Sequence, residues 1–118
     1  MSPTGKSSPV PDELLKGTLD MLILKTLSAQ PMHGYAVARH IERLSNGVFN
    51  VEHGSLYPAL ERLQKNGLVV GKWSASPTGR RARYYTITAA GRRKLGEKVS
   101  AFGRVLAAIE SVMNGAEA

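Results

Sequence analysis

Cationic side chains are concentrated in one stretch of this chain, and their distribution indicates contact with a polyanion. Positions 62 to 96 hold nine Lys and Arg residues and no Asp or Glu, whereas the remaining positions hold seven basic and nine acidic residues. The formal net charge of +7 therefore comes entirely from this stretch. A one-signed block of this kind is typical of nucleic-acid binding, and less often of contact with a membrane surface. The alternative is a basic face that is merely solvated.

Two arginines of this stretch, Arg80 and Arg81, end a turn sequence that begins at Ala75 and is rich in Ser, Pro, Thr and Gly, and Arg83 follows it. Residues 68–74 and 82–88 on either side favour β-structure, so a hairpin with a basic tip is predicted. Alternation along its second strand places Arg81 and Arg83 on the same face as Tyr85 and Ile87. Ile87 is expected to face the core, with Arg83 reaching out from the edge. Arginines here can follow the DNA backbone or enter the minor groove.

A helix predicted from about residue 52 to 66 offers a second surface for DNA. Leu56, Leu60 and Leu63 recur at helical spacing and predict one buried edge. The other side carries small residues first and cations later, so it can approach a duplex closely and donate to phosphates or base edges. The DNA-binding residues predicted in this helix and the hairpin are His53, Gly54, Ser55, Tyr57, Pro58, Arg62, Arg80, Arg81 and Arg83.

Alternatives remain for several of these residues. His53 either contacts DNA or only occupies the first helical turn, and Tyr57 either reaches the outer face or belongs to the core with its hydroxyl at the rim. Pro58 lacks an N–H and is expected to loosen the start of the helix. Trp73, at the end of the first predicted strand, either packs against neighbouring helices or lines a ligand pocket.

Further helices must position these two surfaces. Apolar spacing predicts a helix from Asp12 to about Ala29 and a second one that opens at His33-Gly34-Tyr35, with His33 as a helix-start residue, and stops at Ser45-Asn46-Gly47. Thr88 is a candidate cap of the last helix. Residues 1–11 are predicted to be a disordered Ser/Pro/Gly-rich tail. The expected fold is mainly α with a small β-wing, namely a winged helix-turn-helix domain at 12–88 followed by a C-terminal dimerisation helix at 89–114. The predicted core is Leu19, Leu22, Ile23, Val37, Ile41, Leu44, Leu56, Leu60, Leu63, Val69 and Ile87.

The last predicted helix carries apolar residues at alternating spacings of four and three, which is the pattern of a coiled-coil seam. The simpler interpretation is that this helix packs on its own domain, but an unpaired seam leaves an exposed apolar patch. Pairing in a two-fold dimer fits better, and it predicts two recognition helices about 34 Å apart on a pseudo-palindromic site. The predicted dimerisation residues are Leu15, Leu22, Leu95, Val99, Phe102, Leu106, Ile109 and Met113.

Other function classes find little support in the composition. The chain has 118 residues, no cysteine, and three histidines without metal-ligand spacing. It shows no nucleophile–base set, so neither enzyme activity nor a cofactor or metal is expected. No apolar run approaches the roughly 20 residues of a membrane span, and the first residues lack the apolar segment of a secretory signal. A cytoplasmic protein of one domain, without membrane contact, is therefore expected.

Several motifs in this order resemble those of PadR-type transcriptional regulators, from about Leu14 to Met113. They are LKGTLD at 15–20, HGY at 33–35, GSLYPAL at 54–60, NGL at 66–68, GRRARYY at 79–85 and ITAAG at 87–91. The resemblance is to the compact branch with a single C-terminal helix, and that family tolerates proline at the position of Pro58. It implies a homodimeric winged-helix repressor, often autoregulatory and often released by a small-molecule effector. The alternatives are a winged-helix module that binds protein and a non-specific DNA-coating protein.

Overall fold

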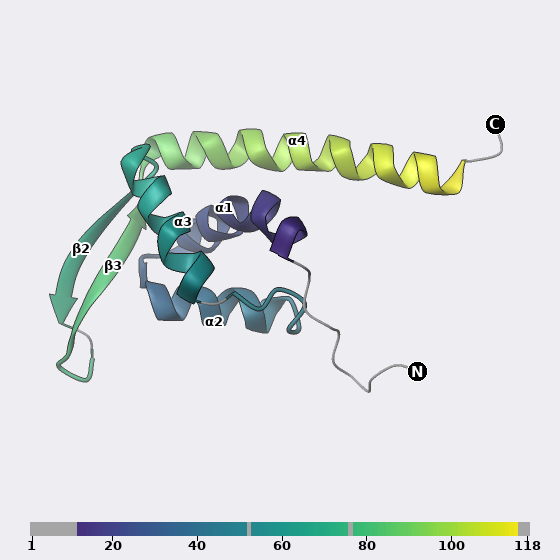
Figure 1. The fold of residues 1–118 in the computed structure, drawn as a ribbon. Coiled ribbons are helices and arrows are strands. Elements are labelled where there is room, and N and C mark those ends of the chain that lie inside the picture. The colour runs from purple at the N-terminus through teal and green to yellow at the C-terminus, as the bar shows by residue number, and fades with distance from the viewer. Residues whose placement is uncertain (1–11, 52, 76, 116–118) are drawn as a thin grey trace.

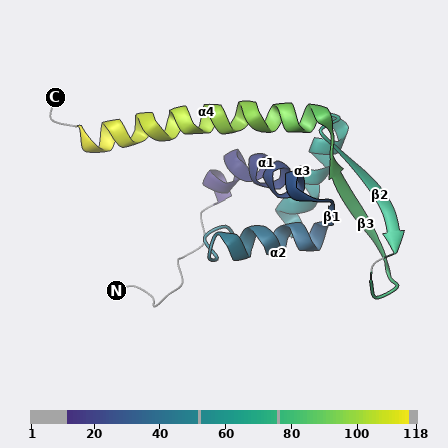
Figure 2. The same ribbon diagram turned by 180° about the vertical axis from the view of Figure 1, so that it is seen from behind.

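The structure is a computed structural model that describes residues 12–51, 53–75 and 77–115, with only the backbone described for residues 12–17 and His53. The predicted disordered tail at residues 1–11 lies outside this range. The described elements are α1 (Asp12–Ala29), β1 (Met32–His33), α2 (Gly34–Leu44), α3 (His53–Lys65), β2 (Val69–Ala75), β3 (Arg81–Ile87) and α4 (Ala89–Asn114). Helices α1, α2 and α3 pack together, β2 and β3 project as a wing, and α4 lies across α1 (Figures 1 and 2). The predicted fold class is confirmed.

Leucine and isoleucine side chains from all three packed helices form the core. Ile23, Leu24, Leu56, Leu60 and Leu63 are at most 1% exposed. Their spacing turns one face of each helix inward, and burying such side chains contributes roughly 1.5–3 kcal/mol each. Most predicted core residues are confirmed. Leu24, Leu27, Val51, Ala59, Leu68 and Tyr85 are buried in addition.

Two predicted core residues differ from expectation. Leu44 is 72% exposed because α2 ends at this residue and the chain turns away through Asn46 and Gly47, both with positive φ. Gly47 is the glycine that the sequence indicated as the stop signal. Leu22 is only partly buried and packs against the edge of the core.

The sheet has three strands rather than the two predicted. The strand order is β1-β3-β2 and both pairings are antiparallel. Two residues, Met32 and His33, pair with Tyr85 and Tyr84 of β3. His33 then caps α2, since its Nδ1 accepts a hydrogen bond from the backbone N–H of Ala36 at 3.2 Å. The helix-start role predicted for His33 is confirmed, and its second role in a strand was not foreseen.

The start of α4 is joined tightly to the base of the wing. Thr88 caps the helix, as predicted, by accepting from the Gly91 N–H at 3.0 Å, and its hydroxyl donates toward the carbonyl oxygen of Gly67 at 2.8 Å. The Thr88 N–H donates to the Leu68 carbonyl at 3.0 Å. A side chain at Gly91 would collide with that same carbonyl, so only glycine fits. From this joint α4 runs over α1 and continues past it (Figure 1).

Candidate nucleic-acid interface

Helix α3 is anchored along its leucine edge and presents its opposite side outward. Leu56, Leu60 and Leu63 are 0–1% exposed, whereas Gly54 and Pro58 are exposed on the other side. A side chain added at Gly54 would meet nothing within 4 Å, so backbone is openly accessible there. Ser55 lies between the two sides and is partly buried. The side chain of His53 lies outside the described residues.

Pro58 lies inside α3 without ending the helix. Its ring removes the N–H that would bond to the carbonyl four residues earlier, which belongs to Gly54. Both residues lie on the exposed side, where water or a ligand donor can satisfy that carbonyl. The predicted loosening is therefore confined to the carbonyl group of Gly54, on the exposed side of the helix.

Tyr57 lies at the rim of α3, between its buried and outward sides. The side chain is 40% exposed, and its ring packs against the first residue of α2. A Cβ at Gly34 would lie 2.8 Å from Tyr57 Cε1 and 2.9 Å from its hydroxyl oxygen. Glycine at position 34 therefore fixes where the Tyr57 ring rests, and the predicted rim position agrees with this geometry.

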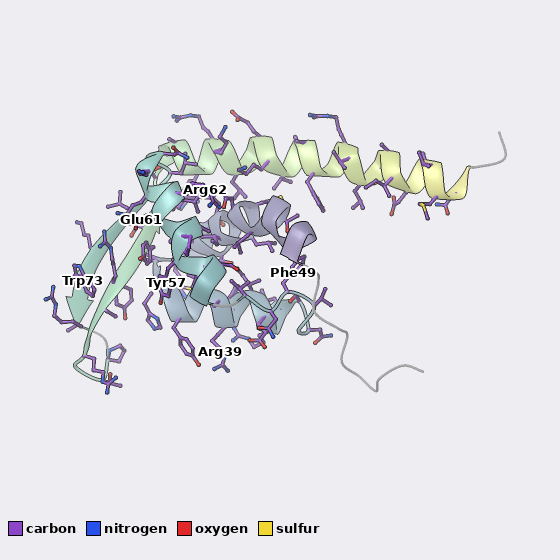
Figure 3. All side chains as sticks on the ribbon, viewed as in Figure 1. Arg39, Phe49, Tyr57, Glu61, Arg62 and Trp73 are labelled. Carbon is purple, nitrogen blue, oxygen red and sulfur yellow. The ribbon has the colours of Figure 1, made fainter. Side chains whose placement is uncertain are left out.

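Arg62 is directed away from the wing arginines. Its guanidinium Nη2 lies 2.6 Å from Asp20 Oδ1 of α1, with the two side chains 51% and 23% exposed. In Figure 3, Arg62 lies at the upper part of α3 beside α1, whereas Tyr57 lies further down the helix. The predicted DNA contact of Arg62 is not supported by this placement, because the cation is already paired with a carboxylate of its own domain.

The wing carries its arginines around a tryptophan. Arg80 and Arg81 are exposed, and Arg83 is partly buried. The guanidinium carbons of Arg81 and Arg83 lie 5.1 and 5.9 Å from the centroid of the Trp73 ring, within cation–π range. Trp73 is 57% exposed, so packing against neighbouring helices does not describe it. The arginines lie toward the tip of the hairpin, as predicted, but their contact with Trp73 was not predicted.

Wing and α3 meet at Tyr85. Its side chain is 6% exposed, and burial raises the pKa of the Tyr85 phenol, with Arg83 acting in the opposite direction and Tyr57 and Glu61 adding to the rise. These electrostatic neighbours come from β3 and from α3. Tyr85 is therefore a buried contact between the two predicted DNA-binding elements.

Helix α2 adds two residues to this surface that the sequence did not single out for DNA contact. Arg39 Nη1 donates to the Tyr35 hydroxyl at 2.9 Å, and its guanidinium carbon lies 5.6 Å from the Tyr35 ring centroid. These contacts with the phenol raise the pKa of Arg39. Arg39 and Tyr57 lie on the same lower side of the molecule in Figure 3. Helical spacing is enough to place Arg39 outward and, four residues after Tyr35, within reach of that hydroxyl.

The cations at the start of α4 lie far from the wing tip. Arg92, Arg93 and Lys94 are exposed at the base of the hairpin, and Arg92 Nη1 donates to the Ser28 carbonyl at 3.3 Å. Seven residues of β3 separate this base from the tip, which corresponds to about 20 Å of extended strand. These three cations therefore belong to a different part of the basic surface.

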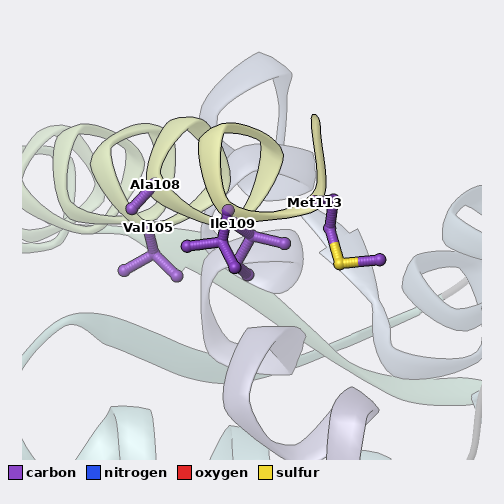
Figure 4. Close-up of a pocket in the computed structure, with 5 residues that line it drawn as sticks. Val105, Ala108, Ile109 and Met113 are labelled. Carbon is purple, nitrogen blue, oxygen red and sulfur yellow. The ribbon is translucent and has the colours of Figure 1, made fainter. Parts of the chain in front are cut away.

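Most of the predicted seam on α4 is exposed. Leu95 packs on the core, but Val99, Phe102, Leu106 and Ile109 are 41–52% exposed and Met113 is 73% exposed. An apolar hollow of about 330 Å³ is lined by Val105, Ala108, Ile109, Val112 and Met113 (Figure 4). The side chain of Leu15 lies outside the described residues. Among the described helices, none combines the length and the hydropathy needed to cross a bilayer.

Three packed helices, a paired wing and an exposed α3 define a winged helix-turn-helix protein. The family described as Transcriptional regulator PadR-like family matches residues 23–97. The chain belongs to this family of DNA-binding transcriptional regulators, which are not enzymes.

Solved structures agree with this assignment, and one curated relative matches nearly the whole chain. A PadR-like transcriptional regulator from Bacillus cereus is 32% identical with a TM-score of 0.75, over 86% of this chain and 97% of that one. A transcriptional regulator from Clostridium thermocellum is 25% identical with a TM-score of 0.77, over 84% and 96%. A protein of Lysinibacillus sphaericus is 28% identical over 92% of this chain and 99% of its own length.

Proposed function

We propose that the protein is a homodimeric repressor that acts in the cytoplasm, binds a pseudo-palindromic DNA site and is released by a small-molecule effector. The observation that carries the proposal is the separation of two surfaces. Helix α3, which carries Gly54 and Tyr57, and the wing, which carries the arginines, lie on one side of the winged domain, and α4 with its exposed apolar residues lies along another (Figure 1). One surface is suited to a polyanion and the other to an apolar partner.

The first half of α3 is the part suited to the major groove. Its outward side offers the accessible backbone of Gly54, the exposed part of the Tyr57 ring and the ring of Pro58, with the partly buried Ser55 beside them. The wing cations Arg80, Arg81 and Arg83 supply the positive charge that phosphates attract. Arg62 is not part of this DNA-reading surface, because its guanidinium is paired with the Asp20 carboxylate.

A second copy of the chain accounts best for the exposed seam. Val99, Phe102, Leu106 and Ile109 form one continuous apolar face with about half of each side chain in solvent. Such a patch on a monomer is costly in water, and pairing two seams removes it. A two-fold pair also presents two α3 helices to successive turns of the duplex, about 34 Å apart.

The effector is expected to be predominantly apolar. The hollow beside Ile109 and Met113 has an almost entirely carbon lining, and a partner helix over the seam would narrow it (Figure 4). Release can be measured as loss of anisotropy from a labelled operator complex during titration with apolar compounds. If no compound that binds the protein lowers its affinity for the operator, the effector part of the proposal fails.

DNA binding is tested by selecting bound fragments from the source genome and footprinting the enriched site. We expect a protected pseudo-palindrome near the chain's own promoter, with affinity that falls steeply as salt rises. Equal affinity for random sequence would indicate a non-specific DNA-coating protein instead. Affinity indifferent to both salt and DNA would favour a protein-binding module.

The dimer is tested by Phe102→Glu combined with Leu106→Glu. The two new carboxylates of each copy would face those of the other across the seam, which should give a monomer by light scattering and weaken operator binding about 100-fold or more, since half of the contacts are lost. Ser100→Glu combined with Ser111→Glu is the matched control, because it adds the same charge on the exposed opposite side of α4. A seam variant that remains dimeric refutes the seam.

A further inference from the structure

The wing shows a feature that the proposed function does not use. Strand pairing sets Trp73 of β2 directly opposite Arg83 of β3, and Arg81 belongs to the next pair toward the tip on the same face. Toward the base, the same face continues with Gly71 opposite Tyr85 and Val69 opposite Ile87. Tyr85 and Ile87 are each 6% exposed. The tryptophan and two arginines therefore extend the inward face of the hairpin beyond the point where the core ends.

The two arginines share one aromatic neighbour, the indole ring of Trp73. Both guanidinium carbons lie within about 6 Å of the Trp73 centroid, the range of a cation–π contact. Arg83 Nε is buried and has no hydrogen-bond partner in the described part of the chain. Within that same part, neither arginine takes part in a salt bridge. The ring is thus the group that contacts both charges.

The arginine closer to the core lies on the side of the wing that faces α3. A Cβ at Gly71 would lie 2.5 Å from Arg83 Nε and 2.9 Å from Gln64 Oε1, an α3 atom. Arg83 therefore occupies space that glycine leaves open between the strand and the recognition helix. From this place its charge is directed toward the region between wing and α3, rather than outward from the edge of the hairpin.

We propose that Trp73 is a positioning residue, which holds Arg81 and Arg83 over its indole ring so that both cations meet the DNA backbone beside α3. The proposal rests on the proposed DNA binding. Two neighbouring guanidinium groups repel each other and have many rotamers, and a shared aromatic surface offsets the repulsion and orders both side chains before DNA arrives. Preordered side chains lose less entropy on binding.

The first test uses substitutions that leave the net charge unchanged. Trp73→Ala, Trp73→Leu and Trp73→Phe are titrated by anisotropy against a fluorescein-labelled duplex of random sequence, so that no operator is needed. We expect Trp73→Ala and Trp73→Leu to bind about three- to tenfold more weakly, the effect of losing one or two exposed cation–π contacts. Trp73→Phe should retain part of the affinity because it keeps an aromatic face. Equal affinity for all three variants and the wild type would overturn the proposal.

A mutant cycle separates positioning from direct contact. In an Arg81→Ala and Arg83→Ala background, Trp73→Ala should cause no further loss, because no cations remain to be positioned. A further loss as large as in the wild type would mean that the indole touches DNA or supports the hairpin itself, and positioning would be refuted. Val70→Ala is the control for general damage, since Val70 lies on the same strand but on its other face and is 45% exposed.

The stacking is also measurable without DNA. Trp73 is the one tryptophan of the chain, so its fluorescence reports this site alone. Replacing Arg81 and Arg83 with alanine should uncover the ring and raise its acrylamide quenching constant, whereas Arg39→Ala should not. An unchanged constant overturns the proposal even if every variant binds DNA. A wild-type protein that binds neither this duplex nor any fragment of the source genome would instead refute the proposed function.

Discussion

Helix α3 and the wing reach the same surface but are held there by different means. Three leucines with at most 1% exposure fix α3 in the core, so its orientation depends on the packing of the whole domain. The outer wing depends on strand pairing and on exposed contacts such as those of Trp73. Substitutions in α3 should therefore alter stability first, whereas substitutions in the outer wing should alter binding with little effect on stability.

The sharpest form of this contrast is Leu60→Ala against Val70→Ala. Leu60 is 1% exposed and Val70 is 45% exposed. We expect the cavity at position 60 to lower the free energy of unfolding by about 2–5 kcal/mol, and the change at Val70 to lower it by about 1 kcal/mol or less. Urea denaturation followed by circular dichroism measures both. Similar losses would show that the wing is as much a part of the core as α3.

Gly34→Ala tests whether the outer rim of α3 can be moved without loosening the core. The new methyl group would press on Tyr57, whose ring is 40% exposed and has room to turn outward. We expect operator affinity to fall about fivefold, the effect of one lost hydrogen bond, with the melting temperature nearly unchanged. Gly96→Ala is the control, since a side chain there meets nothing within 4 Å.

A double variant shows whether the loss of operator affinity in Gly34→Ala acts through Tyr57. If Gly34→Ala acts through the tyrosine, it should cost nothing more once Tyr57→Ala is present. Additive losses would mean that the methyl group meets DNA directly, and that the position of Tyr57 does not depend on α2.

Arg62→Ala should have the smallest effect of the three. A half-exposed ion pair contributes about 1 kcal/mol or less to stability, and we expect operator affinity to change less than about twofold. Asp20→Ala is the matched variant, which breaks the same pair but leaves the cation. A loss of affinity above about tenfold in Arg62→Ala, absent from Asp20→Ala, would return Arg62 to the reading surface.

Local patterns predicted the elements, and pairings across the chain were harder to foresee. Periodic leucines indicated α3, and single capping residues such as His33 and Thr88 marked the helix starts correctly. Strand β1 is too short to leave a pattern, because two residues pair with β3 only after the fold has brought them there. The Arg62–Asp20 pair joins positions 42 apart, which no helical spacing reports.

The candidate site shows the same division. Alternation correctly placed Arg81 and Arg83 on the face of Tyr85 and Ile87. Both strands lie one residue from their predicted positions, in opposite directions, which leaves the pairing register across the turn unchanged. The contact with Trp73 depends in addition on the side-chain conformations of the two arginines, which strand alternation does not report. The exposure of Leu44 likewise depends on whether another element packs against it, which a periodic pattern does not describe.

The joint at Thr88 and Gly91 fixes the start of α4 to the base of the wing, so a rotation there moves the whole helix. With 26 residues, the helix is about 39 Å long, and its first turn is tied to Gly67 and Leu68 at the base of the wing. A rotation of about 5° at this joint displaces the far end by about 3 Å, by the geometry of a stiff rod of that length. In the proposed dimer the same relation would hold in reverse, and a small shift between the two paired α4 helices would turn each wing by a small angle. The spacing between half-sites would then depend on packing along the seam, through the Thr88 hydroxyl and the missing side chain of Gly91.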